Sequence, residues 1–282
     1  EEEIDPSGWM KAVEEAAAAI RGRRLEKVVL ARELRLYADQ PFDAASILER
    51  LYANHPNTYV FAFEFGEECL IGATPERLVK SSGKRLLTTC LAGSIARGRT
   101  EAEDAALGME LFNDRKNQHE HALAVRMVGE TMRRFCVSVD VPDRPILYKL
   151  NNIQHLYTPV GGEAKEGVTI LNVLEALHPT PALGGYPQRD AVEEIRRLER
   201  LDRGWYAAPI GWMNREMDGE FAAAIRSALL QGKEASLFAG CGIVGDSDPL
   251  SEYQETVLKF QPMLTAIRAS GANGEGGNPH DA

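Results

Sequence analysis

A lysine within an apolar strand is the first residue of this sequence that could carry out chemistry. In the segment LEKVVLAREL, alternating side chains place Lys27 on the same face as Leu25, Val29 and Ala31. In a central strand, desolvation would favour the neutral amine, which can take a proton from water or attack a carbon atom. At a sheet edge, the same lysine would reach solvent and guard against aggregation. The strand by itself leaves both interpretations open.

Two further charged residues lie beside strand-like segments. Glu76 follows Pro75 between two such segments, where a rigid turn can hold a carboxyl group at the rim of a sheet, although a solvated turn is the alternative. Arg226 stands among apolar residues of a strand predicted over 219–230. A guanidinium in such a setting usually has a planar anionic partner, so we expect either a substrate carboxylate or an ion pair within the protein.

The last predicted helix carries candidate metal ligands. Asp248 is expected to cap it, and Glu252, Glu255 and Lys259 then share one face. Two carboxylates so placed can hold a hard divalent ion such as Mg²⁺ together with water, and the lysine can meet an anion that the metal also binds. A solvated charged face is the alternative interpretation.

Lys116 and Glu120 share a face at i, i+4 spacing in a long predicted helical stretch, which predicts an ion pair within that helix. The histidines show no HExxH or similar spacing, which argues against zinc chemistry. The cysteines are far apart and form no CxxC pair, so we expect buried free thiols in a reducing cytoplasm: Cys69, Cys90, Cys136 and Cys241.

The elements that must position these residues form blocks of antiparallel strands between helices. Hydrophobic periodicity predicts helices over 8–22, 43–54, 101–138 with a break near Asn113, 167–177, 189–201 and 249–269. Strands are predicted over 25–37, 58–65, 68–72, 77–81, 84–92, 145–150, 153–160, 206–213, 219–230 and 235–244. This order predicts an α+β fold in which large antiparallel sheets pack together and are covered by helices in one domain, 1–269. The Gly- and Asn-rich segment 270–282 is predicted to be a disordered tail.

Composition excludes several classes of function. The 282 residues include 32 Lys and Arg against 42 Asp and Glu, a net charge of −10, which argues against a nucleic-acid or anionic-membrane partner. Apolar stretches fall far short of the roughly 20 residues that a membrane helix needs. The opening EEEID is no secretory signal, and the missing initiator Met leads us to expect a processed or truncated chain.

Nine ordered blocks of this sequence form a recognisable set: KVVLAR (27–32), GATPERLV (72–79), LAGSIARG (91–98), EH (120–121), QHLYTPVGG (154–162), HPTPALGG (178–185), DRGWYAAPIGW (202–212), AIRSALL (224–230) and AGCGIVGDSDPLSEYQETVLK (239–259). Together they resemble the chorismate-utilising enzymes, and isochorismate synthases most of all. They extend from about residue 8 to residue 268. The resemblance implies the α/β/β/α fold of these enzymes. They often carry an extra N-terminal segment, which we expect to be missing from this chain.

The resemblance also implies roles for particular residues. Lys27 matches the general base that activates water, and Glu76 matches the general acid, whose pKa we expect to be raised. Glu120 and Glu255 match the Mg²⁺ ligands, with Glu252 as a water-mediated ligand. The residues implied around the substrate are Arg226, Tyr206, Lys259, Gly93, Ser94, His155, Ala182, Leu183, Gly240 and Gly242.

The implied reaction converts chorismate to isochorismate, for menaquinone or siderophore biosynthesis. Water attacks ring carbon 2 and the hydroxyl at carbon 4 leaves, so no glutamine amidotransferase partner is expected. Anthranilate synthases typically have Gln at the position of Lys27 and Thr at that of Ala182, and aminodeoxychorismate synthases differ around Lys27. Salicylate synthase is the main alternative, and an inactive or truncated chorismate-binding module is the non-enzymatic one. The sequence predicts no particular oligomeric state.

Overall fold

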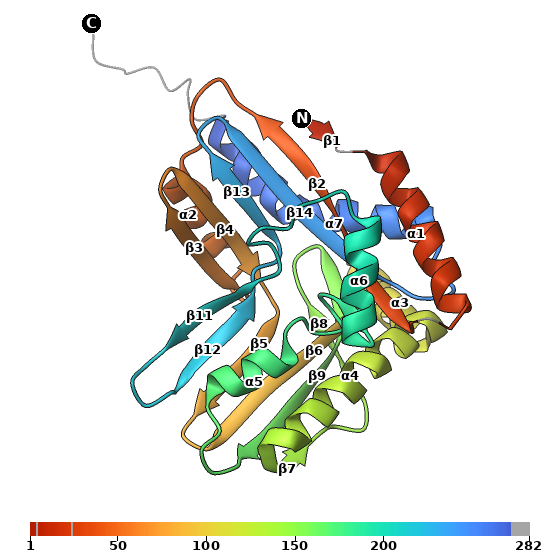
Figure 1. The fold of residues 1–282 in the computed structure, drawn as a ribbon. Helices are drawn as coiled ribbons and strands as arrows, with labels where there is room; N and C mark the ends of the chain where they lie inside the picture. Colours follow the sequence, from red (N-terminus) through yellow and green to blue (C-terminus); the bar gives the residue numbers. More distant parts are fainter. Residues whose placement is uncertain (4, 24, 272–282) are drawn as a thin grey trace, which may run out of the picture.

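Two seven-stranded antiparallel sheets form the framework of the chain (Figure 1). The computed structural model describes residues 1–3, 5–23 and 25–271. The first sheet contains, in spatial order, β1 (Glu2–Glu3), β2 (Lys27–Tyr37), β14 (Glu234–Ile243), β13 (Ser227–Gln231), β4 (Glu68–Thr74) and β3 (Tyr59–Phe65), with β10 (Gly185–Tyr186) also paired to β2. The second contains β11 (Pro209–Met213), β12 (Gly219–Ala223), β5 (Arg77–Ser82), β6 (Arg85–Ala96), β9 (Ile153–Ala164) and β7 (Cys136–Asp140), with β8 (Ile146–Lys149) also paired to β9.

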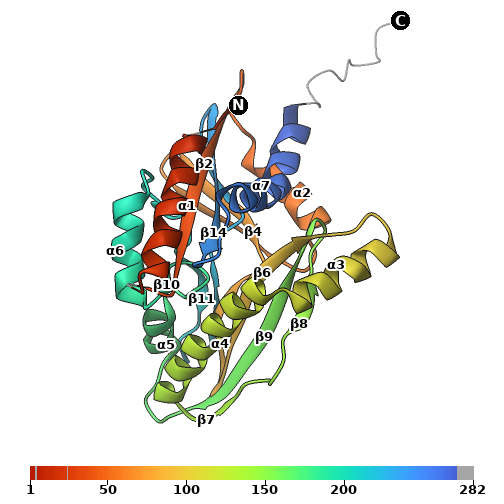
Figure 2. The ribbon, with the colours of Figure 1, turned by 90° about the vertical axis from the view of Figure 1, so that its right-hand side faces the viewer.

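Helices pack on each sheet (Figure 2). The first sheet is contacted by α1 (Pro6–Arg21), α2 (Ala44–Asn54), α6 (Gln188–Leu198) and α7 (Pro249–Gly271). The second is contacted by α3 (Glu101–Asn113), α4 (Arg115–Phe135) and α5 (Ile170–Leu177). Asp114 separates α3 from α4 and caps the latter, because its side chain accepts a hydrogen bond from the amide of Asn117 (2.8 Å). The predicted break near Asn113 and the α+β fold are confirmed.

Three buried apolar clusters hold the layers together. The largest joins the second sheet to α4 and α5 and reaches Ala31 and Phe238 of the first sheet. A second packs α2 and α7 on the first sheet, and a third packs α1 there beside Ala191 of α6. β2 is therefore buried over nearly its whole length, including its charged residues Lys27, Arg32 and Glu33.

Some predicted elements differ from the observed ones. The helix predicted to reach residue 138 ends at Phe135, because Cys136–Asp140 pairs with β9 as β7. The short strands β1 and β10 were not predicted, since each depends on pairing with a distant segment. The cysteines are buried and free as expected. Helix α7 includes two residues of the predicted tail, and residues 272–282 lie outside the described residues. Within the described ranges, no helix is both long and apolar enough to cross a membrane.

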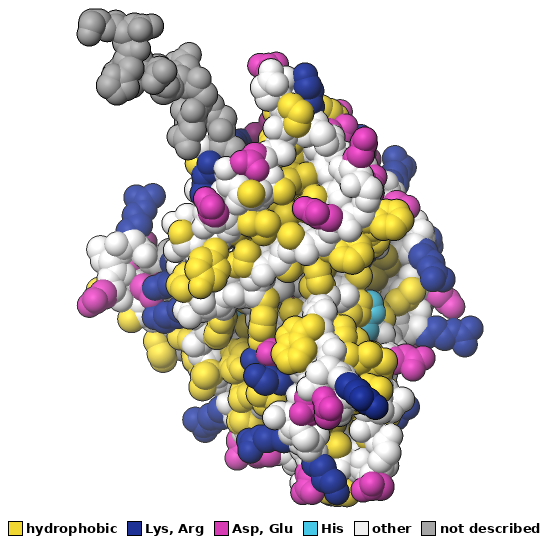
Figure 3. Space-filling model, turned by 90° about the vertical axis from the view of Figure 1, so that its left-hand side faces the viewer, with side chains coloured by type: hydrophobic (Ala, Val, Ile, Leu, Met, Phe, Trp, Pro, Cys, Tyr) yellow, Lys and Arg dark blue, Asp and Glu magenta, His cyan; other side chains and the backbone are white. Residues whose placement is uncertain are grey.

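One face of the molecule exposes apolar side chains around β3 and β11 (Figure 3). No residue of β3 is buried, although this strand carries the sequence YVFAFEF. Phe63 and Phe65 pack edge-on against Trp205, and Trp212 of β11 is 61% exposed. Both strands end their sheets, so this face combines exposed aromatic groups with two free strand edges.

Replacing Gly185 with alanine is expected to cost about 3 kcal/mol or more of unfolding free energy. Gly185 has a φ of 137°, and a Cβ there would lie 2.2 Å from the carbonyl oxygen of Lys27. Gly167 also has a positive φ, 76°, but a Cβ there would contact nothing within 4 Å. Gly167→Ala is therefore the control and should cost about 1 kcal/mol. Urea unfolding of both variants measures the difference, and equal losses would contradict the expectation.

Candidate active site

Two links between the sheets meet at one place in the molecule. The link from β4 to β5 contains Glu76, and the link from β12 to β13 contains Arg226. The amide of Ala73 donates to the carbonyl of Arg226 (3.1 Å), and the amide of Ala223 donates to the carbonyl of Glu76 (2.9 Å). The chain thus passes between the sheets twice at one point, and each passage places a charged residue there.

Arg226 interrupts the strand predicted over 219–230. Its φ of 52° lies in the left-handed region, where a strand cannot continue. β12 therefore ends at Ala223 in the second sheet, and β13 begins at Ser227 in the first. The prediction of one continuous strand is wrong, because the largely apolar composition of this segment gives no sign of a change of sheet.

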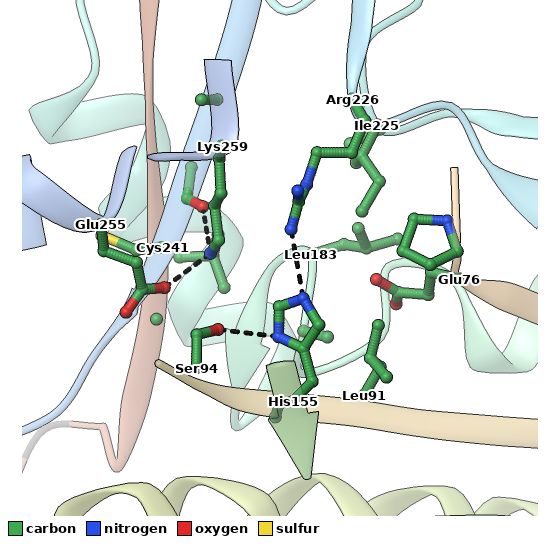
Figure 4. A pocket seen from close by; sticks show the side chains of 18 of the residues that line it. Glu76, Leu91, Ser94, His155, Leu183, Ile225, Arg226, Cys241, Glu255 and Lys259 are labelled. Atoms are coloured by element: carbon green, nitrogen blue, oxygen red, sulfur yellow. Dashed lines mark hydrogen bonds and ion pairs between the residues drawn. The ribbon is translucent and has the colours of Figure 1, made fainter. Parts of the chain in front are cut away.

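A cavity of about 60 Å³ lies beside these links (Figure 4). Every predicted site residue except Lys27 and Glu252 lines it: Glu76, Gly93, Ser94, Glu120, His155, Ala182, Leu183, Tyr206, Arg226, Gly240, Gly242, Glu255 and Lys259. These residues come from both sheets and the links between them, from α4 and α7, and from the segments between α5 and β10 and between α6 and β11. The structure therefore brings together residues that lie far apart in the sequence.

Glu76 is a buried carboxyl group, only 4% exposed, so the solvated-turn interpretation is wrong. Its Oε1 atom accepts a hydrogen bond from the hydroxyl of Thr180 (3.3 Å). Burial raises the pKa of Glu76 to about 7, in spite of the opposing charge of Lys27. The expected direction is confirmed, and a large share of molecules carry a proton on this group at neutral pH.

Arg226 is a buried cation without a carboxylate partner. Among the residues that the structure describes, no carboxylate oxygen lies within ion-pair distance of its guanidinium, which donates instead to Nε2 of His155 (3.3 Å). Burial lowers the pKa of Arg226 to about 10. The alternative of an internal ion pair is therefore wrong, and this cation is suited to an anionic ligand.

His155 is held in its neutral form. Because a guanidinium only donates, Nε2 of His155 must accept, and the ring proton lies on Nδ1, which is 2.9 Å from the hydroxyl oxygen of Ser94. Burial and the charge of Arg226 lower the pKa of His155 well below its ordinary value. The imidazole thus adds no charge beside Arg226.

Lys27 is fully buried, and its strand is not at an edge there, because Tyr186 of β10 pairs with it. The edge-strand interpretation is therefore wrong. The Nζ atom of Lys27 lies 2.9 Å from Oε1 of Glu120. In the described part of the chain, this ammonium has no acceptor in hydrogen-bond geometry, so the contact is an ion pair without an oriented hydrogen bond. Lys27 itself does not line the cavity, but it contacts Glu120, which does.

Gly242 allows this ion pair to lie directly against β14. A Cβ at Gly242 would lie 2.1 Å from Oε1 of Glu120 and 2.6 Å from Cε of Lys27. Gly240 and Gly242 both belong to β14, where they pair with β2, within the strand predicted over 235–244. The close approach of side chains explains why Gly242 must be glycine.

Glu120 from α4 and Glu252 and Glu255 from α7 form an acidic cluster in which each carboxylate pairs with a lysine. The pairs are Glu120 with Lys27 (2.9 Å), Glu255 with Lys259 (2.6 Å), and Glu252 with Lys116. Burial and the charge of Glu255 raise the pKa of Glu252. For Glu120, burial acts in the same direction, but the charges of Lys27 and Lys116 outweigh it and lower the pKa.

Two sequence-based expectations about this cluster were wrong. Lys116 does not pair with Glu120 within α4, but reaches across to Glu252 of α7. The face of α7 that carries Glu252 is not solvated, since Glu252 is 1% exposed. Asp248 does cap α7, because its side chain accepts from the amide of Ser251 (2.8 Å).

The acidic cluster has donors of the kind that Mg²⁺ prefers, namely carboxylate oxygens. In the described ranges, no three side chains of His, Cys, Asp or Glu already lie together as a metal-binding group. The ammonium of Lys116, however, lies in the field of all three carboxylates, as a cation would. The donor set therefore fits a divalent cation, and the predicted magnesium site stays a prediction.

The remaining walls of the cavity are largely uncharged. Tyr206 is buried and stacks on Phe238 with ring centroids 5.3 Å apart, while the amide of Ser94 donates a hydrogen bond to Oδ1 of Asn117 (3.2 Å). The sequence did not indicate Thr180, or the contact of Lys116 with α7, as parts of this site. Thr180 lies in the block HPTPALGG, which was the signal that could have indicated it. The partners of Thr180 and Lys116 are distant in the sequence, so no local pattern reveals these contacts.

This chain is similar to known proteins over most of its length. A model of the family described as chorismate binding enzyme matches residues 1–268. The chain is 49% identical to isochorismate synthase MenF of Bacillus subtilis, over 94% of this chain and 56% of that protein. It is 44% identical to the salicylate biosynthesis isochorismate synthase of Pseudomonas aeruginosa, over 93% and 55%. The chain thus spans about half the length of these curated relatives.

A solved structure agrees with these sequence comparisons. The menaquinone-specific isochorismate synthase MenF from Escherichia coli matches with a TM-score of 0.86 and 33% identity. The match covers 94% of this chain and 61% of that one. The sheets and helices described above are therefore those of a solved enzyme fold.

The raised pKa of Glu76 predicts a pH dependence of stability. Between pH 4.5, the ordinary pKa, and about 7, the folded chain keeps a proton on Glu76 that the unfolded chain releases. The free energy of unfolding should therefore fall as pH rises through this range, by on the order of 3 kcal/mol from this group. Glu76→Gln should lack this contribution. Urea unfolding at several pH values measures it, with the exposed Glu166→Gln as control, and parallel profiles for wild type and Glu76→Gln would contradict it.

Proposed function

The chain belongs to the family of chorismate-binding enzymes, and from this premise we propose that it is an isochorismate synthase, which converts chorismate to isochorismate. The names of the relatives described above include this activity. In the reaction, water adds at ring carbon 2 of chorismate and the hydroxyl at ring carbon 4 leaves. The protein must therefore bind a dianion, supply a proton on one side of the ring and remove one on the other.

The observation that carries this proposal is a buried, unpaired guanidinium on the same cavity as a carboxyl group of raised pKa. Arg226 has no internal carboxylate among the described residues, and a carboxylate of chorismate would supply one. Lys259 lines the same cavity and adds a second cation. A protein with a net charge of −10 can bind a dianion only where such cations are gathered.

Glu76 is proposed as the general acid. Its pKa of about 7 keeps a substantial protonated population at neutral pH, and the proton passes to the oxygen of the departing hydroxyl, which leaves as water. Thr180 holds Oε1 of Glu76, so the carboxyl group keeps one orientation. The backbone of the sheet-to-sheet link fixes its position beside Arg226.

Lys27 is proposed as the general base. In the reaction, its amine takes a proton from the water molecule whose oxygen bonds to ring carbon 2. The ammonium lies against Glu120 at the cavity wall, so Lys27 must leave this ion pair and lose its proton before it can act. The side chain of Lys27 lies against Gly242, and its ion pair with Glu120 contains no oriented hydrogen bond.

The acidic cluster is proposed to hold Mg²⁺, with Glu120 and Glu255 as ligands and Glu252 acting through water. When bound, the cation would neutralise the ring carboxylate of the substrate. Arg226 and Tyr206 would orient the rest of the substrate, with the backbone at Gly93, Ser94, Gly240 and Gly242. Ala182, Leu183 and neutral His155 complete a wall that brings no further charge to the ring.

Product analysis tests the proposed reaction. The purified chain is incubated with chorismate, with Mg²⁺ or with a chelator, and the products are separated by chromatography. We expect isochorismate only with Mg²⁺, in the same final mixture whether the reaction starts from chorismate or isochorismate. Salicylate with pyruvate would instead indicate a salicylate synthase, and bound but unreacted chorismate would indicate an inactive binding module.

Substitution of the acid and the base tests their roles. Glu76→Gln and Lys27→Gln should each lower kcat/KM by roughly 10²–10⁴-fold, because each removes one proton transfer from the transition state. Lys80→Gln is the matched control, since Lys80 lies on β5 and pairs with Glu220 outside the cavity. Either variant retaining more than about a tenth of wild-type kcat/KM, with the control unchanged, would remove that residue from the mechanism.

A further inference from the structure

Lys116 is a largely buried cation that the proposed reaction does not use. It lies on α4 one turn before Glu120, and its ammonium bonds Oε1 of Glu252 on α7. The side chain of Lys116 is 23% exposed and that of Glu252 is 1% exposed. Burying a charged pair costs free energy, because each ion loses most of its hydration, so interactions within the protein must offset this cost.

The charges of the acidic cluster provide these interactions. Lys27 and Lys259 neutralise Glu120 and Glu255, so Lys116 is the third ammonium that balances the third carboxylate. Burial acts to lower the pKa of Lys116, but the charges of Glu252, Glu255 and Glu120 outweigh it and raise the pKa. Lys116 therefore stays charged and responds to the whole cluster, not to Glu252 alone.

We propose that Lys116 is the internal counter-cation of the acidic cluster and weakens the affinity of this cluster for a divalent cation. The inference rests on the metal site in the proposed function. In the absence of metal, the ammonium stabilises the buried Glu252. When a divalent ion enters, the same ammonium repels it and competes with it for a carboxylate.

Removing this charge while keeping the shape of the side chain should strengthen metal binding. Two unit charges a few ångströms apart in a partly buried site interact strongly enough to change an equilibrium constant by about tenfold or more. Lys116→Met should therefore bind a divalent ion about tenfold tighter or better, and should melt at a lower temperature than wild type in chelator. Lys116→Arg keeps the charge and should bind metal as wild type does.

The experiment measures Mn²⁺ binding to the purified chain by electron paramagnetic resonance, without substrate. The variants are Lys116→Met, Lys116→Arg and, as a control, Lys84→Met, whose side chain is 68% exposed on the turn between β5 and β6. Lys116→Gln, which can still donate a hydrogen bond to Glu252, replaces the methionine variant if the latter does not fold. A merely structural role of Lys116 would leave metal affinity unchanged or reduce it.

Tighter binding by the uncharged variants, with wild-type affinity in Lys116→Arg and Lys84→Met, is the expected result. Unchanged or weaker binding by the uncharged variants overturns the inference. Absence of Mn²⁺ binding in every protein overturns it together with the proposed metal site. Failure of the chain to convert chorismate would bear on the proposed reaction only, because the binding measurement contains no chorismate.

Discussion

The free-energy cost of burying charged groups constrains this structure more than any other physical effect. Four cations and four carboxyl groups meet where the two sheets and two helices converge, and each needs a partner or a shifted pKa. Glu120 and Glu252 take lysine partners from other elements, and Glu255 pairs with Lys259 of its own helix. Glu76 meets the requirement by holding a proton. Arg226 alone among these groups has neither a carboxylate partner nor a neutral form at ordinary pH. The placement of α4 against α7, and the glycine at position 242, follow from these pairings.

Much of the framework could be predicted from local sequence pattern. The apolar face around Lys27, the i, i+3, i+7 spacing of Glu252, Glu255 and Lys259, and the cap at Asp248 are signals carried within a few residues. Each of these elements lies near its predicted bounds. The positions of the site residues around one cavity came from the resemblance, because periodicity contains no information on which strands become neighbours.

The errors share one physical cause. Whether Lys116 pairs with Glu120 or Glu252 depends on where α7 lies relative to α4, which no local spacing contains. The break at Arg226 depends on the chain changing sheets, and β7, β1 and β10 exist only through pairing with distant strands. Local propensity was overridden by tertiary contacts in every case. The resemblance predicted that the pKa of Glu76 is raised. The cause of this shift is burial where the two sheets join, and that could be seen only in the fold.

The two sheet-to-sheet links also determine how firmly each part of the site is held. Backbone hydrogen bonds tie Glu76 and Arg226 to the neighbouring strand ends, so these two residues form one rigid unit. The acidic cluster, in contrast, is carried by two helices that pack on different sheets. A rotation of one sheet relative to the other about these links would change the distance between Glu76 and Arg226 little, while altering the distance between the carboxylates of α4 and those of α7. The fold thus carries one half of the site on the links themselves and the other half on elements that belong to different sheets.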